Sequence, residues 1–510
     1  MRIAWIVPLV LLMSLSAAAA APDPFQAGVD AARQGNLDAA IEQFQQAVAT
    51  DPTDATAMSW IGYLHLRAGR PRDAVTWLDK AVKQNPRAAA AWNNLGNAYV
   101  ELKEFDKAVA TYSEVLAIGS DDFDAHYNLA NAYLAQGSLQ PAIKEYKKAL
   151  ALDPNSADAH NNLGLVYSRV AQSYFTMRPK YAAEGDAERA ERALQEGIRL
   201  YNQAAEEYGA AAKITPGKDI YWLNMALAHR EVAAASGAAA AREKAIDALR
   251  KAAALRPDDY TVHMALADLY SESNLLAEAT AEYAAAARIS PDEFDPHYRL
   301  GLIYYKTGAY EPAVAAYEKA LAIRPRDAST LNNLGCVYHK TNRHQEAVDA
   351  FTQAAEADPK FATAHANLGA VYTVMGKSEE ALAAWRRVIE LDPGNAGARL
   401  ALAHHYLNAG DTERAEKLYR EVTTISPQSV EAHNALGMIL YRRGKVDEAI
   451  AAFNRALQVN PRYAPALNNL GVMYQEKGQT SRAEQMYRRA LEVDPGHADA
   501  RQNLERLGKP

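Results

Sequence analysis

Cysteine is almost absent from this chain: its 510 residues include one, Cys336. A single thiol cannot form a disulfide within the chain, and no CxxC pair is available for a redox or metal site. No neighbour in the sequence obviously lowers the pKa of Cys336, so we interpret it as a small neutral filler. The stability of the folded chain must then come from packing.

An excess of basic charge is also missing. The formal net charge is −7, and both signs are mixed along the chain. A nucleic-acid-binding protein needs a positive footprint for phosphates, so we expect no nucleic-acid partner. HExxH, GxSxG and dinucleotide-binding motifs are absent, and Gly376-Lys377-Ser378 lacks the glycine spacing of a phosphate-binding loop. We therefore expect no catalytic residues, cofactor or metal; an enzyme with a site hidden in the chain is the alternative.

Long hydrophobic runs are lacking except at the N-terminus. Met1-Arg2 precedes an apolar run over residues 3–15, and alanines follow up to Ala20. This pattern is typical of a signal peptide, here residues 1–20. The run would span about 20 Å as a helix, whereas a bilayer core is about 30 Å thick. We expect export to a bacterial periplasm or to the medium, with no transmembrane segment after cleavage; an uncleaved N-terminal anchor is the alternative.

A 34-residue period dominates what is present. Prolines mark it at Pro52, Pro86, Pro154, Pro216, Pro257, Pro291, Pro325, Pro359, Pro393, Pro427, Pro461 and Pro495. Most intervals are 34 residues, and Ser120 occupies the one vacant slot. Counting back from each proline gives thirteen repeats between Ala21 and about His497. A fixed period of this length indicates a repeat architecture.

The aligned repeats agree at fixed positions. Positions 7 and 8 read Leu-Gly, position 11 is aromatic, position 20 is alanine and position 24 is a large ring, as in Leu334-Gly335, Tyr338, Ala347 and Phe351. Positions 7 and 11 lie one turn apart on a first helix and predict a buried stripe. Small residues at positions 8 and 20 let the second helix approach. Glycine suits the turn between the helices, and the proline at position 32 ends the second helix.

This pattern resembles the tetratricopeptide-repeat (TPR) family, over nearly all of the chain after residue 20. The resemblance implies an all-α fold: a right-handed superhelix, or α-solenoid, of about thirteen helix-turn-helix repeats with a concave inner groove. We assign repeats 1–4 to residues 21–156, repeats 5–6 to 157–259, and repeats 7–13 to 260–497. Residues 498–510 are expected to form a capping helix and tail.

The period breaks within residues 157–259, where two intervals exceed 34 by 28 and by 7 residues. Seven residues are close to two helical turns, so the helices can lengthen without rotating their buried faces. We predict a projecting hairpin with one helix from Asn161 to about Met177, stopped by Pro179, and a return helix from about Asp186 to Ile214. The expected facing stripes are Val170, Tyr174 and Met177 against Leu194, Ile198 and Tyr201. These stripes either zip the hairpin together or make residues 170–200 a docking arm.

Asparagine recurs at position 6, on the first helix and off the core stripe: Asn94, Asn128, Asn162, Asn224, Asn333, Asn367 and Asn469, with Asn503 in the cap. Each amide offers a donor and an acceptor, so such a row in the groove could bond the backbone of an extended peptide. The row resembles the asparagine ladder in the superhelix of O-linked N-acetylglucosamine transferases, without a transferase domain. The alternative is that asparagine is simply common at this position.

A second predicted groove cluster mixes aromatic and basic residues at positions 5, 6, 12 and 13: Tyr298, Arg299, Tyr305, Lys306, His339, Lys340, Tyr441 and Arg442. Such a mixture suits an acidic or aromatic peptide, although a solvated face is the alternative. Six histidines at position 4, including His160 and His263, are expected to pack between repeats rather than to bind metal.

Together these features predict a non-enzymatic scaffold that binds peptide segments or partner proteins in the cell envelope. An accessory factor for envelope biogenesis, or for export of polysaccharide or protein, is the narrower alternative. The sequence does not specify the partner or the oligomeric state.

Overall fold

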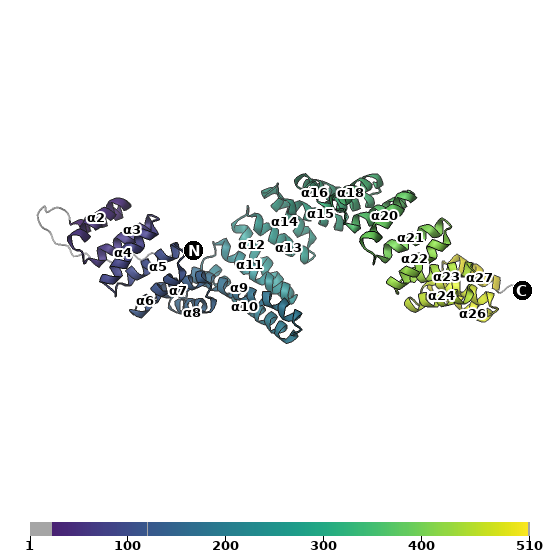
Figure 1. Cartoon of the computed structure of the whole chain (residues 1–510), viewed down its shortest axis with the longest axis horizontal. Coiled ribbons are helices and arrows are strands. Elements are labelled where there is room, and N and C mark those ends of the chain that lie inside the picture. The colour runs from purple at the N-terminus through teal and green to yellow at the C-terminus, as the bar shows by residue number, and fades with distance from the viewer. Residues whose placement is uncertain (1–22, 120, 508–510) are drawn as a thin grey trace. The chain divides into compact units, whose positions relative to one another are not determined.

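The computed structural model describes residues 23–119 and 121–507, so the predicted signal peptide lies outside the described residues. Within these ranges the chain forms 27 α-helices and no strand (Figure 1). The expectation of an all-α solenoid of many repeats is thereby confirmed. The chain divides into two compact units, residues 1–282 and 283–510, and each is described by itself.

The helices of the first compact unit are α1 (Pro24–Arg33), α2 (Leu37–Thr50), α3 (Ala55–Arg67), α4 (Pro71–Gln84), α5 (Ala89–Glu101), α6 (Phe105–Ala117), α7 (Phe123–Gln136), α8 (Leu139–Leu152), α9 (Ala157–Ala183), α10 (Ala187–Ile214), α11 (Asp219–Ser236), α12 (Ala239–Leu255) and α13 (Tyr260–Glu272). Helix α14 (Leu276–Ile289) contains the division. The second compact unit continues with α15 (Phe294–Thr307), α16 (Tyr310–Ile323), α17 (Ala328–Lys340), α18 (His344–Ala357), α19 (Ala362–Val374), α20 (Ser378–Leu391), α21 (Ala396–Asn408), α22 (Thr412–Ile425), α23 (Val430–Arg442), α24 (Val446–Val459), α25 (Ala464–Glu476), α26 (Thr480–Val493) and α27 (Ala498–Leu507).

Neighbouring helices pack in antiparallel pairs, α1 with α2 through α11 with α12, and α15 with α16 through α25 with α26. Within each compact unit, each of these pairs also packs against the first helix of the next pair, so the core of the unit runs through its stack of hairpins. Helix α27 covers α26, where a further repeat would sit. This is the nearest-neighbour arrangement that a repeat sequence needs, because one hairpin alone cannot bury its apolar face.

Local sequence sets the helix boundaries. Several first helices begin at an acidic or amide cap; the Asp54 carboxylate, for example, accepts hydrogen bonds from the backbone N–H groups of Thr56 and Ala57, both at 2.9 Å. The turn inside a repeat usually requires a positive φ, which Gly69 (φ 71°) adopts without strain. Lys103, Asn274 and Asn342 hold the same conformation at φ 58–61°.

The glycine at position 8 makes room for the ring at position 24 of the same repeat. A β-carbon on Gly335 would lie 2.6 Å from Cε1 of Phe351, closer than van der Waals contact allows. Gly96 and Tyr112, Gly301 and Tyr317, and Gly471 and Tyr487 repeat this relation. The glycine at position 8 therefore faces the ring at position 24 on the second helix. The sequence pattern alone predicts that position 8 pairs with the alanine at position 20 instead.

The ring at position 4 ties down the loop before it. Nε2 of His263 lies 2.9 Å from the carbonyl oxygen of Pro257, six residues earlier. The same contact links His160 to Pro154, His297 to Pro291, His433 to Pro427, Trp92 to Pro86 and Trp222 to Pro216. These histidines thus fasten the stack through hydrogen bonds as well as packing.

The long hairpin forms, but two of its predicted details are wrong. Helices α9 and α10 have 27 and 28 residues, against 13 and 14 in α17 and α18. Pro179 does not stop α9, which continues to Ala183. The exposed Pro179 leaves one helical carbonyl group without its N–H donor, and the chain turns later, at Gly185 (φ 79°).

The predicted stripe on α9 is also only partly correct. Val170 is buried, but Tyr174 and Met177 are exposed. Phe175 takes their place: its ring packs over Gly197, with its centroid 5.4 Å from that of Tyr201. On α10, Tyr201 is buried as expected, and Leu194 and Ile198 are half-buried. The prediction missed Phe175, the residue after Tyr174, whose ring fits against α10 because residue 197 is a glycine.

Candidate functional site

The row of asparagines at position 6 bonds to the preceding repeat. Nδ2 of Asn367 donates to Oδ1 of Asn332 at 2.8 Å, across 35 residues. Asn469 donates to Asn434, and Asn503 to Asn468, each at 3.0 Å. Asn162 and Asn333 donate to the hydroxyls of Tyr127 and Tyr298, and Asn224 donates to Asn161. Position 5 of one repeat is therefore the acceptor for position 6 of the next.

The N-terminal members of the row are enclosed. Asn94 and Asn128 are 0% and 2% exposed. By the 35-residue rule Asn128 should donate to Asn93, yet Nδ2 of Asn128 and Oδ1 of Asn93 have no hydrogen-bond partner. Peptide contact by the row thus depends on its half-buried members, each of whose amide nitrogens already donates at least one hydrogen bond within the chain.

Part of the aromatic and basic cluster comes together on α15 and α17. Tyr298 receives the Asn333 amide, and burial raises the pKa of Tyr305, with Cys336 and Tyr310 nearby. Arg299 and Lys340 are exposed and form no ion pair with any described residue. We call Tyr298, Arg299, Tyr305 and Lys340 the basic-aromatic surface; Lys306 and His339 border it.

The C-terminal members of the predicted cluster do not join this surface. Tyr441 and Arg442 lie on α23, and the Tyr441 hydroxyl donates to the Glu476 carboxylate on α25. That pairing raises the pKa of Tyr441. The predicted cluster is therefore two separate places on the second compact unit.

Cys336 lies between the basic-aromatic surface and the asparagine row. Burial raises the pKa of its thiol, and the charge of Lys340 offsets part of that effect. Asn367 Nδ2 lies 3.7 Å from the sulfur. A raised pKa keeps the thiol protonated and unreactive, as the filler interpretation expects.

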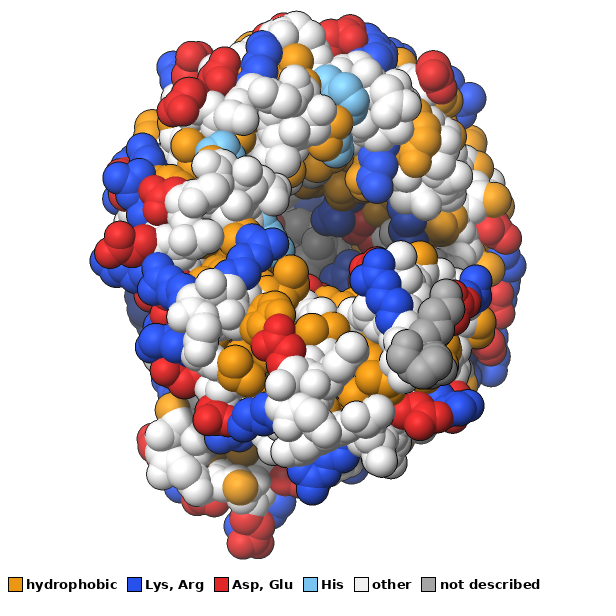
Figure 2. Space-filling view, turned by 90° about the vertical axis from the view of Figure 1, so that its right-hand side faces the viewer, with side chains coloured by type: hydrophobic (Ala, Val, Ile, Leu, Met, Phe, Trp, Pro, Cys, Tyr) orange, Lys and Arg blue, Asp and Glu red, His pale blue; other side chains and the backbone are white. Residues whose placement is uncertain are grey.

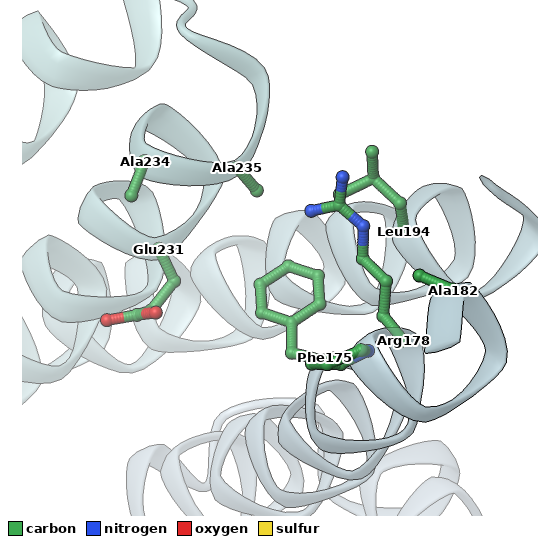
Figure 3. A pocket seen from close by; sticks show the side chains of 8 residues that line it. Phe175, Arg178, Ala182, Leu194, Glu231, Ala234 and Ala235 are labelled. Carbon is green, nitrogen blue, oxygen red and sulfur yellow. The ribbon is translucent and has the colours of Figure 1, made fainter. Parts of the chain in front are cut away.

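The hairpin borders a cleft that the sequence did not predict. It has a volume of about 450 Å³ between α9, α10 and the C-terminal half of α11. Phe175 and Leu194 provide apolar walls, while Arg178 and Glu231 lie on opposite sides (Figure 3). Exposed Tyr174 and Met177 lie on the same stretch of α9. The sequence feature that could have indicated the cleft is Gly197, because a glycine in a long helix leaves room for a large side chain of the facing helix, here Phe175.

Acidic and basic side chains are mixed over the outer part of the face shown in Figure 2. Among residues 23–119 and 121–507, no three His, Cys, Asp or Glu side chains are placed to hold a metal ion. In the same part of the chain no helix combines the length and apolar character needed to cross a bilayer.

Solved structures of repeat proteins are similar at low identity. YrrB, a TPR protein with an unusual peptide-binding site, is 25% identical, covering 38% of this chain and 100% of its own, with a TM-score of 0.34. A tetratricopeptide repeat protein from Parabacteroides merdae is 17% identical over 49% of this chain and 99% of its own (TM-score 0.36). Yeast Tom70 is 16% identical over 90% and 96% (TM-score 0.33). Among curated proteins there is no match.

Family models match several segments. Models described as TPR repeat or tetratricopeptide repeat match residues 25–84, 61–123, 130–170, 267–308 and 440–507. The C-terminal domain of cilia and flagella-associated protein 70 matches residues 295–464. Because these segments coincide with the stacked helical hairpins described above, the chain is a tetratricopeptide-repeat solenoid.

Proposed function

We propose that this chain is a non-enzymatic scaffold of the cell envelope that binds a partner protein through an extended acidic segment. The observation that carries the proposal is the basic-aromatic surface. Arg299 and Lys340 are exposed and form no ion pair with a described side chain. They lie on α15 and α17, neighbouring helices that a hydrogen bond between Tyr298 and Asn333 joins. Unpaired cations beside aromatic rings favour carboxylate-bearing and aromatic partners.

The asparagine row has a supporting role in this proposal. Its amide hydrogens hold consecutive repeats in register, so the surface presented by α15, α17 and α19 is preformed. A preformed surface binds an extended segment with less loss of conformational entropy. Replacing Asn94, Asn128, Asn162, Asn333 and Asn367 together would disturb the stack itself, so that variant is a poor test of binding.

A pull-down from envelope extract tests the proposal with a matched control. The test variant carries Arg299→Ala and Lys340→Ala. The control carries Lys417→Ala and Arg455→Ala, which remove the same charge from exposed sites on α22 and α24. We expect the test variant to lose its partner at 150 mM salt, while the control keeps it. At this salt concentration, charges in direct contact still attract one another, because the screening length is about 8 Å. Equal capture by both variants contradicts the proposal.

The envelope location rests on the N-terminal sequence and has its own test. We expect the exported chain to begin at Ala21 when its N-terminus is determined by mass spectrometry. A chain that keeps residues 1–20 and sediments with membranes supports the anchored alternative. The identity of the captured partner separates a general scaffold from an accessory factor for envelope biogenesis or for polysaccharide or protein export.

A further inference from the structure

Among the rings at position 24 in the second compact unit, the ring of Trp385 is not enclosed. At position 24, Tyr317, Phe351, Tyr419, Phe453 and Tyr487 are 0–1% exposed, whereas Trp385 on α20 is only half-buried. A pocket of about 680 Å³ lies beside it, between α19, α20 and α21. Ala370, Thr373, Ala401, His404 and Asn408 contribute to its lining.

Small side chains explain why the pocket is open. Position 9 of the same repeat is Ala370 for Trp385 and Leu302 for Tyr317. Position 6 of the following repeat is Ala401 for Trp385 and Asn333 for Tyr317. The His404 ring does not close the space, because its Nδ1 bonds to the Tyr419 hydroxyl at 3.0 Å.

The chain itself shows what fills this place elsewhere. Trp60 holds position 6 of the second repeat, and Phe44 holds position 24 of the first. Their rings are stacked, with centroids 5.5 Å apart and planes 8° from parallel, and Trp60 is only 7% exposed. Ala401 and Trp385 occupy the same two positions in the eleventh and tenth repeats. Trp60 therefore stacks on Phe44, whereas Ala401 has no ring to stack on Trp385.

We propose that an aromatic side chain of a partner protein enters this pocket and stacks on Trp385, as Trp60 stacks on Phe44. The inference deepens the proposed function and rests on it for the biological partner. Lys340 lies on α17, which packs against α19. The segment recognised is therefore an aromatic residue flanked by carboxylates, since the ring fits the slot and the acidic flank faces an unpaired cation.

The pocket can be tested without knowing the partner. The full chain is labelled with 5-fluorotryptophan and observed by fluorine NMR. The Trp385 signal is assigned as the one that disappears in the Trp385→Phe variant. Benzyl alcohol is the aromatic probe, and cyclohexylmethanol is the saturated probe of the same shape. We expect benzyl alcohol to shift the Trp385 signal in a saturable way, and to leave the signals of Trp60, Trp77, Trp92 and Trp222 in place. An unmoved Trp385 signal, or equal shifts from both probes, overturns the inference.

Filling the slot from within provides the second arm. Ala401→Trp copies the pairing of Trp60 with Phe44, and Ala370→Leu copies Leu302; either should abolish the benzyl alcohol shift. The control is Ala366→Tyr, which adds a ring on α19 outside the pocket. Ala366 is at position 5 of its repeat, and Tyr298 at position 5 of the eighth repeat shows that a ring is tolerated there. Unchanged thermal unfolding establishes that each variant is folded. Persistence of the shift in both filled variants overturns the inference.

Comparing two variants in the pull-down distinguishes failure of this inference from failure of the proposed function. Losing one aromatic stack should weaken capture about tenfold in Ala401→Trp. If Arg299→Ala with Lys340→Ala abolishes capture and Ala401→Trp leaves it unchanged, the scaffold proposal holds and the pocket inference fails. If the probe binds but no partner depends on the basic-aromatic surface, the proposed function fails alone.

Discussion

Nδ2 of Asn367 lies 2.8 Å from Oδ1 of Asn332, although 35 residues separate them in the chain. Asn332 is 6% exposed, so this bond is shielded from water. The same relation between positions 6 and 5 recurs along the stack, which makes it a register device as well as a contact. Its strength is open to measurement.

The Asn332→Ala variant should lose about 1–2 kcal/mol of unfolding free energy, because it leaves the Asn367 amide without its buried acceptor. A double-mutant cycle with Asn367→Ala in urea should give a coupling of about 1 kcal/mol. Asn408→Ala, on the exposed end of α21, is the control and should change stability little. A coupling near zero would mean that the bond contributes nothing.

The Gly335→Ala variant should be destabilised by about 1–2 kcal/mol, because its methyl group would meet the buried Phe351 ring. The cost should stay at the low end of overpacking, since the fourth repeat places Ala130 opposite Tyr146. Gly217→Ala, where an added β-carbon meets nothing within 4 Å, is the control. Urea midpoints compare the two, and an equal loss in both variants contradicts the steric argument.

The Lys103→Gly variant should be more stable by about 0.5–1 kcal/mol, because glycine adopts φ 61° without the penalty of a β-carbon. The reciprocal change, Gly69→Ala, tests backbone strain alone, since nothing lies within 4 Å of its added methyl group. It should lower the thermal midpoint while Lys103→Gly raises it. Shifts of the same sign would refute this explanation.

Acid should destabilise the fold through His229. Burial, assisted by the charge of Lys244, lowers the pKa of this imidazole to about 4. Because the unfolded chain binds the proton first, the stabilisation is complete above about pH 6.5 and is lost as pH falls towards 4, by about 3 kcal/mol. Urea midpoints measured between pH 7.5 and 4.5 should show this loss.

His229→Tyr is the matched variant, because tyrosine occupies position 11 in most repeats. Its midpoint should depend less on pH over the same range. Some dependence should remain, since burial also lowers the pKa values of His65, His339 and His365. An undiminished slope would assign the acid sensitivity to those groups instead.

Replacing residues 174–196 by a short glycine-rich turn should leave the solenoid folded, because the extension adds about four turns to each of α9 and α10 and borders the next repeat only at the C-terminal half of α11. Circular dichroism and a thermal scan check the fold. If the exposed Tyr174 and Met177 belong to a docking arm, this variant should lose a partner that the double variant Tyr174→Ser/Met177→Ser also loses. Capture by both variants would show that the stripes serve only to hold the hairpin together.

The sequence by itself determined the repeat, its helices and its turns. Local patterns were sufficient to place the turn at Gly69, the helix end at Pro257 and the four-residue spacing of Leu334 and Tyr338. Each of these features acts within one or two turns of helix. The extra residues after Pro154 likewise indicated that two helices are lengthened, although the end of α9 was predicted wrongly.

Only the tertiary structure decided which side chains meet. The acceptor of Asn367 lies in another repeat, and the exposure of Trp385 depends on two alanines on neighbouring helices. Pro179 stayed inside α9, and Phe175 replaced Tyr174 at the hairpin seam, because packing across the pair outweighs local preference. Sequence spacing determines which face of a helix a residue occupies; how deeply that face is covered depends on side chains far away in the chain.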